Sequence, residues 1–241
     1  MPLELLVFDL DGTLIDSKLD LALSVNATRA DLKLPPLPHE TIFSYVGNGA
    51  PALIRRALGE GASEEQFQRS LQFFLDYYRA HMLENTRLYP GIRETLDRLA
   101  MAGVQMAVLT NKPVRFSRDL IRGLGLADRF SAVYGGNSFD TKKPNPEGLR
   151  HLMAELHAAP QETMVVGDSG IDVQTARSAG AWSCGVTYGF QPETFADNPP
   201  DFLVNTPAEL LKIVGNARQG GLSGRPSELA RPAGDGGLPA E

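Results

Sequence analysis

The chain has 241 residues, 42% of them hydrophobic, so it can bury a sizeable core as one large domain or two unequal ones. A net charge of −6, with no run of five or more Lys or Arg residues, argues against nucleic acid as a partner. The single cysteine, Cys184, excludes an internal disulfide. Because the amino terminus is also unlike a secretory signal and no apolar run reaches 18 residues, we expect a cytoplasmic protein with no membrane partner.

Short apolar runs alternate with helical patterns over most of the chain. The apolar, β-branched runs predict strands at 3–10, 104–110, 130–136, 163–168, 181–189 and 201–204. Helical patterns lie between them at 91–102, 114–124, 146–157, 170–179 and 206–216. Continuously apolar strands suit a sheet that is covered on both faces, and their alternation with helices implies parallel βαβ units. The sequence therefore predicts an α/β fold with a doubly wound parallel sheet.

Residues 16–87 interrupt this alternation and contain no convincing strand. Ser17 and Asp20 predict a capping pair at the start of a helix. The apolar residues of that helix predict a buried face made of Leu19, Ala22, Leu23, Ala27 and Ala30. We expect a second helix at 49–58 and a third whose buried stripe is Phe67, Leu71, Phe74, Tyr78 and Met82. This segment reads as a small helical domain inserted after the first strand.

These patterns also predict the domain boundaries. Residues 1–15 and 88–218 form the expected catalytic core, and residues 16–87 form the inserted all-helical domain. Residues 219–241 contain six Gly, three Pro and no aromatic residue. Such a composition cannot bury enough apolar surface to offset the entropy of ordering, so we predict a disordered tail.

Polar residues gather at the predicted strand ends. In open α/β sheets, ligands bind beyond the carboxyl ends of the strands. The first, second and fourth strands, and the loop before the fourth, contribute acids, hydroxyls, an amide and lysines there. These residues are Asp9, Asp11, Thr110, Asn111, Lys142, Lys143, Asp168, Ser169 and Asp172.

The carboxylates of this set would repel one another. Two carboxylates about 4 Å apart repel by about 4 kcal/mol at an effective dielectric constant near 20. A cluster of Asp9, Asp11 and Asp168 would therefore take up protons unless a cation were present. Carboxylates with phosphate and water are the usual ligands of Mg²⁺. The sequence thus predicts a magnesium site that receives an anionic substrate.

Asp9 and Asp11 are two residues apart on an extended segment, so both can face one reacting centre. An ionised Asp9 can act directly as a nucleophile and form an aspartyl-phosphate. The second carboxyl, of Asp11, would protonate the leaving alkoxide and then accept a proton from the attacking water. Gly12 would let the backbone approach the phosphoryl group closely. Thr110 and local amides would bind the phosphoryl oxygens, and Lys143 would add a fixed positive charge.

Each motif also has a structural interpretation. The stretch "DLDGT" is compatible with a simple turn, and Thr110 with a helix cap. Lys143 is compatible with a solvated loop charge, and Asp172 with support of the helix that follows the fourth strand. The occurrence of all four motifs in order, each at a strand end or an adjoining loop, favours a catalytic site.

The segments "FDLDGT", "LTN", "KKPNP" and "GDSGID" closely resemble the four motifs of haloacid dehalogenase superfamily phosphatases. The resemblance covers residues 3–215 and implies a Rossmann-like core with an alpha-helical cap. It implies Asp9 as nucleophile and Asp11 as general acid/base. It also implies Mg²⁺ held by Asp9, the Asp11 main-chain carbonyl and Asp168. The phosphate-binding positions would be Thr110, Asn111 and Lys143, and Asp172 would be a supporting acid.

The stretch "YVGNGAPALIRRAL" at 45–58 resembles the corresponding segment of bacterial phosphoglycolate phosphatases. In this interpretation Gly47, Asn48 and Gly49 precede a helix whose first amides would receive a substrate carboxylate. A glycine turn that merely redirects the chain is the alternative. The resemblance implies hydrolysis of a small phosphorylated metabolite, most simply 2-phosphoglycolate.

Several rival functions stay open at this point. Within the enzyme class they are hydrolysis of a sugar phosphate, a nucleotide or pyrophosphate, and a sugar-phosphate mutase. From another class, a phosphorylatable receiver domain also groups acids, a Thr and a Lys around Mg²⁺, but it is much shorter and has no inserted domain. A hydrolase would release many phosphates per chain, whereas a switch would keep its phosphoaspartate.

Overall fold

The structure is a computed structural model that describes residues 2–220 and 222. Its main sheet has six strands in the order β5-β4-β1-β6-β7-β8, and every neighbouring pair is parallel. The strands are β1 (Leu5–Phe8), β4 (Gln105–Leu109), β5 (Ala132–Tyr134), β6 (Thr163–Gly167), β7 (Trp182–Val186) and β8 (Phe202–Val204). The predicted doubly wound α/β sheet is confirmed.

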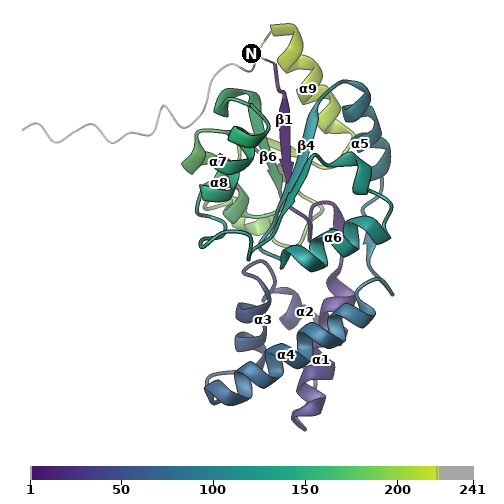
Figure 1. The fold of residues 1–241 in the computed structure, drawn as a ribbon, viewed down its shortest axis with the longest axis vertical. Helices are drawn as coiled ribbons and strands as arrows, with labels where there is room; N and C mark the ends of the chain where they lie inside the picture. Colours follow the sequence, from purple (N-terminus) through teal and green to yellow (C-terminus); the bar gives the residue numbers. More distant parts are fainter. Residues whose placement is uncertain (1, 221, 223–241) are drawn as a thin grey trace, which may run out of the picture.

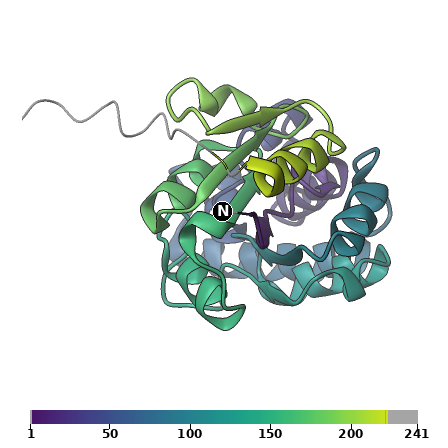
Figure 2. The same cartoon turned by 90° about the horizontal axis from the view of Figure 1, so that it is seen from above.

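Helices cover both faces of this sheet (Figures 1 and 2). They are α5 (Ile92–Met101), α6 (Val114–Gly123), α7 (Glu147–Glu155), α8 (Gly170–Ala179) and α9 (Glu209–Gly220), with 3₁₀ turns η1 (Ala127–Arg129), η2 (Pro160–Glu162) and η3 (Pro192–Phe195). In β1, Leu5 and Val7 pack into the cluster that contains residues of α7 and α8. Leu6 and Phe8 pack into the cluster that contains residues of α5, α6 and α9. Because every β1 side chain is buried, the strand is apolar throughout rather than alternating.

Residues 18–81 form a group of helices below the carboxyl-end edge of the sheet (Figure 1). The helices are α1 (Lys18–Asp31), α2 (His39–Phe43), α3 (Ala50–Leu58) and α4 (Glu64–His81). The sequence pattern did not predict the short α2. Ser63 and Gln66 form a capping box that starts α4. The predicted stripe of α4 is buried apart from Leu71, which is half-buried.

Of the predicted face of α1, Ala22 is buried and Ala27 is half-buried, but the prediction is wrong at Leu19, Leu23 and Ala30. Leu19 and Leu23 are 41% and 40% exposed, and the buried face instead carries Leu21, Val25 and small polar residues. Two of those residues, Ser24 and Thr28, donate hydrogen bonds to backbone carbonyls one turn earlier. Such bonding satisfies their hydroxyls inside the helix and allows their burial. Because these polar residues are buried, the buried face of α1 does not coincide with its most apolar positions.

The predicted capping pair of Ser17 and Asp20 is also wrong. Ser17 makes no side-chain cap hydrogen bond, because its hydroxyl donates to Asp11. Asp20, which is 1% exposed, accepts from the backbone N–H and the side chain of both Asn85 and Thr86. The carboxylate of Asp20 thus joins the start of α1 to the segment that leaves α4.

Two short strands, β2 (Ile15–Asp16) and β3 (Arg87–Leu88), pair antiparallel where the chain enters and leaves the helical group. The expectation that 16–87 contains no strand is therefore wrong at its two ends. Two-residue strands carry too little periodicity to be recognised from sequence. The division into a core and an inserted domain at these positions stays a prediction.

At the carboxyl end, α9 continues to Gly220, two residues beyond the predicted end of the core at 218. Apart from its first residues and Leu222, the predicted tail at 219–241 lies outside the described residues. Within the part of the chain that the structure describes, no helix combines the length and apolar character needed to cross a membrane.

Candidate active site

The register of the sheet brings the strand-end residues together. Phe8 pairs with Val108 on one side and with Val166 on the other. Asp9 therefore emerges from the centre of the sheet, between the ends of β4 and β6. Thr110 follows β4, and Asp168 follows β6. All three side chains lie at one edge because the strands are parallel and end at the same level.

Lys143 lies between two carboxylates. Its Nζ is 2.9 Å from Asp9 Oδ1, an ion-pair contact, and donates a 2.6 Å hydrogen bond to Asp172 Oδ1. The Lys143 side chain is 4% exposed, so this is no solvated loop charge. Burial opposes its charge, yet Asp172 and Asp9 raise the pKa of Lys143 above its ordinary value. The loop lysine is thus a fixed buried cation beside Asp9.

Burial lowers the pKa of a lysine but raises the pKa of an acid. It raises the pKa of Asp9 to about 6; Lys143 lowers that pKa and Asp172 adds to the rise. Burial, followed by the carboxylates of Asp172 and Asp9, raises the pKa of Asp168 well above its ordinary value. One lysine does not neutralise these three acids, so the group favours protons or a further cation.

The geometry of the acids suits a metal ion. One carboxylate oxygen each from Asp9, Asp168 and Asp172 lies within 4.8 Å of the others. Hard oxygen donors with excess negative charge are what Mg²⁺ selects. The cluster includes Asp172 rather than the side chain of Asp11, whose expected contribution is its main-chain carbonyl. The residues present therefore fit a divalent cation.

Gly12 has a packing role in addition to the one expected of it. At this glycine, with φ of 83°, a Cβ would lie 2.2 Å from Asp168 Oδ2. The missing side chain thus makes room for the Asp168 carboxylate, which also accepts a 2.6 Å hydrogen bond from the Phe190 N–H. Gly12 is required by the packing of the acid cluster.

Asp172 supports the start of α8, as one interpretation of the sequence expected. The backbone N–H and the hydroxyl of Ser169 donate to its Oδ2, which forms the capping box of α8. The other carboxylate oxygen of Asp172, Oδ1, accepts the hydrogen bond from Lys143 Nζ. The helix cap therefore orients an acid whose second oxygen faces the cluster.

Asp11 points away from Asp9 in this structure. Its carboxylate accepts bonds of 2.9 and 3.1 Å from Lys112 Nζ and one of 2.5 Å from Ser17 Oγ. Lys112 is 6% exposed and also donates a 2.8 Å hydrogen bond to Tyr78 Oη on α4. Burial would lower the pKa of Lys112, but Asp11 and Tyr78 raise it above its ordinary value. Our sequence analysis missed Lys112; its place directly after Thr110 and Asn111 was the available signal.

Thr110 and Asn111 both line the cavity that contains these acids. The Thr110 hydroxyl accepts a 3.3 Å hydrogen bond from the Lys112 N–H. Asn111 Nδ2 donates to the carbonyl oxygens of Gly47 and Lys143, each at 3.1 Å. The Asn111 side chain thus joins the helical group to the loop that carries Lys143.

The loop before α3 contacts the core through its carbonyl groups. Val46 O accepts from Gln191 Nε2, Gly47 O from Asn111 Nδ2 and Asn48 O from Lys142 Nζ. We call these three hydrogen bonds the clasp. Gly47 and Gly49 line the cavity, and their φ values of 114° and 84° belong to the left-handed region. Lys142, for which sequence reasoning assigned no function, thus contacts the loop before α3.

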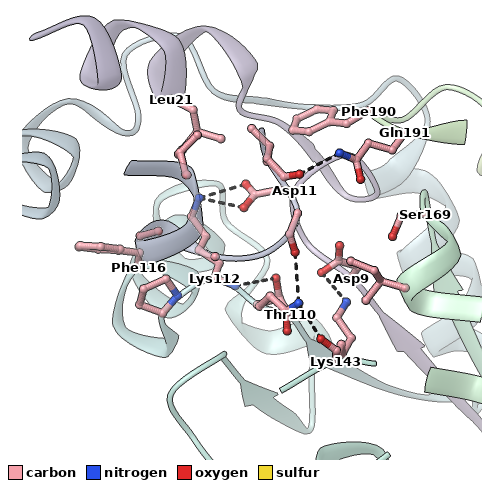
Figure 3. A pocket seen from close by; sticks show the side chains of 18 of the residues that line it. Asp9, Asp11, Leu21, Thr110, Lys112, Phe116, Lys143, Ser169, Phe190 and Gln191 are labelled. Atoms are coloured by element: carbon pink, nitrogen blue, oxygen red, sulfur yellow. Dashed lines mark hydrogen bonds and ion pairs between the residues drawn. The ribbon is translucent and has the colours of Figure 1, made fainter. Parts of the chain in front are cut away.

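Figure 3 shows the cavity and the opposed positions of the two lysines, with Asp11 next to Lys112 and Asp9 next to Lys143. The cavity volume is about 50 Å³, enough for only a few water-sized groups. The core supplies its acids and lysines. Its remaining lining is largely apolar and includes Leu21, Leu53, Phe74, Phe116 and Phe190. The site therefore combines charged side chains from the core with an apolar lining that leaves little free space.

Comparison with known proteins agrees with this arrangement. Residues 6–186 match the family described as haloacid dehalogenase-like hydrolase. A curated protein named phosphoglycolate phosphatase from Mannheimia succiniciproducens is 39% identical over 219 residues, covering 88% of this chain and 98% of that protein. A protein of the same name from Vibrio vulnificus is 40% identical over 219 residues, covering 88% of this chain and 96% of that protein.

The fold has close counterparts among solved structures. The crystal structure of a predicted phosphoglycolate phosphatase from Haemophilus somnus superposes with a TM-score of 0.83 at 35% sequence identity. That match covers 87% of this chain and 97% of the other. The similarity extends over nearly the whole described chain, including the helical group as well as the sheet.

Proposed function

The chain belongs to the haloacid dehalogenase-like hydrolase family, and we propose that it is a Mg²⁺-dependent phosphatase that hydrolyses 2-phosphoglycolate through a phosphorylated Asp9. The observation that carries this proposal is the position of Asp9. Its carboxylate lies at the centre of the sheet edge, in contact with a buried lysine and next to two further acids. Such a group can attack phosphorus without a base to deprotonate it.

In the first half-reaction, a carboxylate oxygen of Asp9 forms a bond to phosphorus as the bond to the ester oxygen breaks. Asp11 gives a proton to that leaving oxygen, so glycolate departs with a hydroxyl group. In the second half-reaction, Asp11 takes a proton from water as the water oxygen attacks phosphorus. The Asp9–phosphorus bond breaks, and inorganic phosphate leaves.

Asp9, Asp168 and the Asp11 main-chain carbonyl would hold Mg²⁺, with Asp172 as the supporting acid. When bound, the ion neutralises charge on the transferring phosphoryl oxygens and lowers the repulsion between nucleophile and substrate. Lys143 acts on the same charge from a fixed position, because two carboxylates orient its ammonium. The hydroxyl of Thr110 and the backbone at Asn111 would bind phosphoryl oxygens.

The helical group, residues 16–87 in our proposed division, would act as the cap that closes over the substrate. Its apolar side chains exclude water from the acids, which strengthens every charge interaction inside. The small cavity favours a leaving group of few atoms. Together with the names of the relatives, this size supports phosphoglycolate, with a small metabolite rather than a macromolecule as the partner and the cytoplasm as the proposed location.

The experiment is a phosphate-release assay on a panel of small esters, with Mg²⁺ and with a chelator. We expect many turnovers per chain on 2-phosphoglycolate, less on sugar phosphates, nucleotides and pyrophosphate, and none with the chelator. Quenching the reaction with ³²P-labelled substrate should leave an acid-stable, hydroxylamine-labile label on Asp9. A label that accumulates without turnover would identify a switch domain, and phosphate retained on a sugar would identify a mutase.

A further inference from the structure

Lys112 is a buried cation that the proposed reaction does not use. It lies directly after β4 and is bound on two sides, by Asp11 from the core and by the Tyr78 hydroxyl from α4. Its ammonium also lies 4.5 Å from the centre of the Tyr78 ring. A buried charge is costly unless it is paired, so its place at the cavity wall calls for a reason.

The position of Lys112 separates it from the phosphoryl group. Lys143 contacts Asp9 and Asp172, whereas Lys112 contacts Asp11 and neither of those acids. Figure 3 shows the Asp11 carboxylate between Lys112 and Asp9. Since Asp9 attacks phosphorus and Asp11 serves the leaving oxygen, Lys112 lies at the leaving-group end of the cavity.

The charges of the cavity are uneven at that end. Among the described residues that line it, Lys112 and Lys143 are the only Lys or Arg. The other side chains of the cavity wall around Lys112 include Leu21, Phe74 and Phe116, which offer no donor. The nearby clasp presents carbonyl oxygens that core side chains already occupy. A second anionic group on the substrate therefore has Lys112 as its side-chain counter-charge.

We propose that Lys112 binds the carboxylate of the substrate's leaving group, and that it does so in exchange for Asp11. This inference rests on the proposed phosphatase function and names the residue that selects the substrate class, a phosphate ester whose leaving group carries a carboxylate. The exchange breaks one ion pair and forms another, with no covalent change. Tyr78 remains as the second partner that orients the ammonium.

The exchange links recognition to the chemical step. While Asp11 is paired with Lys112, its oxygens are held away from the leaving oxygen. A substrate carboxylate on Lys112 releases Asp11, which takes up a proton from solvent and turns toward that oxygen as its proton donor. An ester without the carboxylate binds its phosphoryl group equally well but leaves Asp11 paired. Selectivity should therefore be expressed in kcat as well as in KM.

The test compares 2-phosphoglycolate with 2-hydroxyethyl phosphate, in which CH₂OH replaces the carboxylate. We expect the wild-type protein to prefer phosphoglycolate. In Lys112→Met, kcat/KM for phosphoglycolate should fall about 10- to 100-fold, the range expected for one hydrogen-bonded charge pair. The value for hydroxyethyl phosphate should rise, because this ester loses no carboxylate contact and Asp11 is no longer held by Lys112.

Two further variants control for a merely structural effect. Tyr78→Phe removes the partner hydroxyl and keeps the ammonium, so it should lower kcat/KM for phosphoglycolate by a smaller factor than Lys112→Met does, and should change the value for hydroxyethyl phosphate less. Lys112→Arg keeps the charge and should retain part of the preference for phosphoglycolate. If Lys112→Met fails to fold, Lys112→Arg carries the test, because its displaced charge should still affect phosphoglycolate more than the neutral ester.

The outcomes separate this inference from the function on which it rests. Equal losses for both esters in Lys112→Met, or no loss for either, would overturn the role of Lys112. Wild-type protein that hydrolyses both esters equally well would overturn it too, while leaving the phosphatase proposal intact. Wild-type protein that releases phosphate from no ester would instead refute the proposed function.

Discussion

The core side and the helical side of the cavity treat buried polar atoms in different ways. On the core side, charge is matched by charge, as Lys143 is held by Asp9 and Asp172. On the helical side, the cavity lining is largely apolar, and the hydrogen bonds to the core include the three of the clasp. Breaking a buried ion pair costs about 3–5 kcal/mol, whereas a typical hydrogen bond contributes about 0.5–1.5 kcal/mol.

This difference suggests how the two regions divide the work. The acid and lysine cluster must keep one geometry through the reaction, and its strong pairing provides that. The helical side must open to admit substrate, and contacts that water can replace allow it to open at modest cost. The Lys112–Tyr78 hydrogen bond is where the two regions meet at the reacting groups.

The largest effect is expected on the core side, from Asp9→Asn. An amide cannot attack phosphorus as a carboxylate can, so kcat should fall at least about 1,000-fold. Stability should be unchanged or slightly higher, because the substitution removes one of three crowded acids. Phosphate release and the melting temperature are the two measurements. Substantial residual turnover would contradict the nucleophile assignment. It would also mean that the chemical step does not depend on the charged residues of the core side.

A second large effect is expected within the helical group, from Asp20→Asn, because Asp20 joins the start of α1 to the segment that leaves α4. The carboxylate of Asp20 accepts from Asn85 and Thr86, so an amide would face several donors with one acceptor oxygen. Unfolding free energy should fall by about 2–3 kcal/mol. Asp31→Asn in the same helix is the control, since its ion pair with Arg69 is exposed and the loss of that pair should cost under about 1 kcal/mol. Equal effects of the two variants would show that Asp20 does not hold the start of α1 to the segment that leaves α4.

The acid cluster should make stability depend on pH and on magnesium together. Because burial raises the pKa of Asp9 to about 6, the folded metal-free protein holds this proton more tightly than the unfolded chain does. That contribution to stability is present at low pH and is lost as pH rises through about 6. Mg²⁺ competes with protons, so its affinity should fall about tenfold per pH unit below that value.

The measurement is the rise in melting temperature on adding Mg²⁺, taken from pH 5 to pH 8. We expect a large rise at pH 8 and a small one at pH 5. The same rise at both pH values would mean that the ion does not bind at the acids. The acids of the core side would then not be a charged site that a cation stabilises.

The smallest effect is expected in the clasp, from Gln191→Leu. Loss of the 2.8 Å hydrogen bond to Val46 O should lower unfolding free energy by about 1 kcal/mol and raise KM a few-fold, because closure of the helical side is weakened. Gln174→Leu makes the same change at a hydrogen bond to Asn198 that lies within the core. It should affect stability similarly and leave KM unchanged. A rise in KM in both variants would indicate a general loss of stability rather than a weaker clasp.

Much of the site could be read from the chain because its residues follow strands. Asp9, Thr110 and Asp168 each come directly after an apolar run or end it, and parallel strands end at a common edge. The doubly wound α/β fold followed from the alternation of strand and helix patterns. The four sequence motifs identified the family. These are local signals, each contained in a few neighbouring residues.

Other features had no local signal. The face of α1 was set by Ser24 and Thr28, whose hydroxyls bond to the helix backbone. The Ser17 and Asp20 side chains met the pattern of a helix cap but found partners elsewhere. For Ser17 and Asp20, partners distant in sequence competed successfully with the local hydrogen bonds that the sequence pattern predicts.

By itself, then, the sequence determined the parallel sheet, the family and the order of acids, hydroxyl and lysine along the strand ends. Only the tertiary structure decided that Lys112 joins Asp11, 101 residues away, to Tyr78, 34 residues away, and that Gln191 reaches Val46 across 145 residues. The physical reason is that strand ends are positioned by backbone hydrogen bonding, which follows from periodicity. Contacts between the helical side and the core depend on how two surfaces formed by residues distant in sequence pack, and no short stretch of sequence encodes that fit.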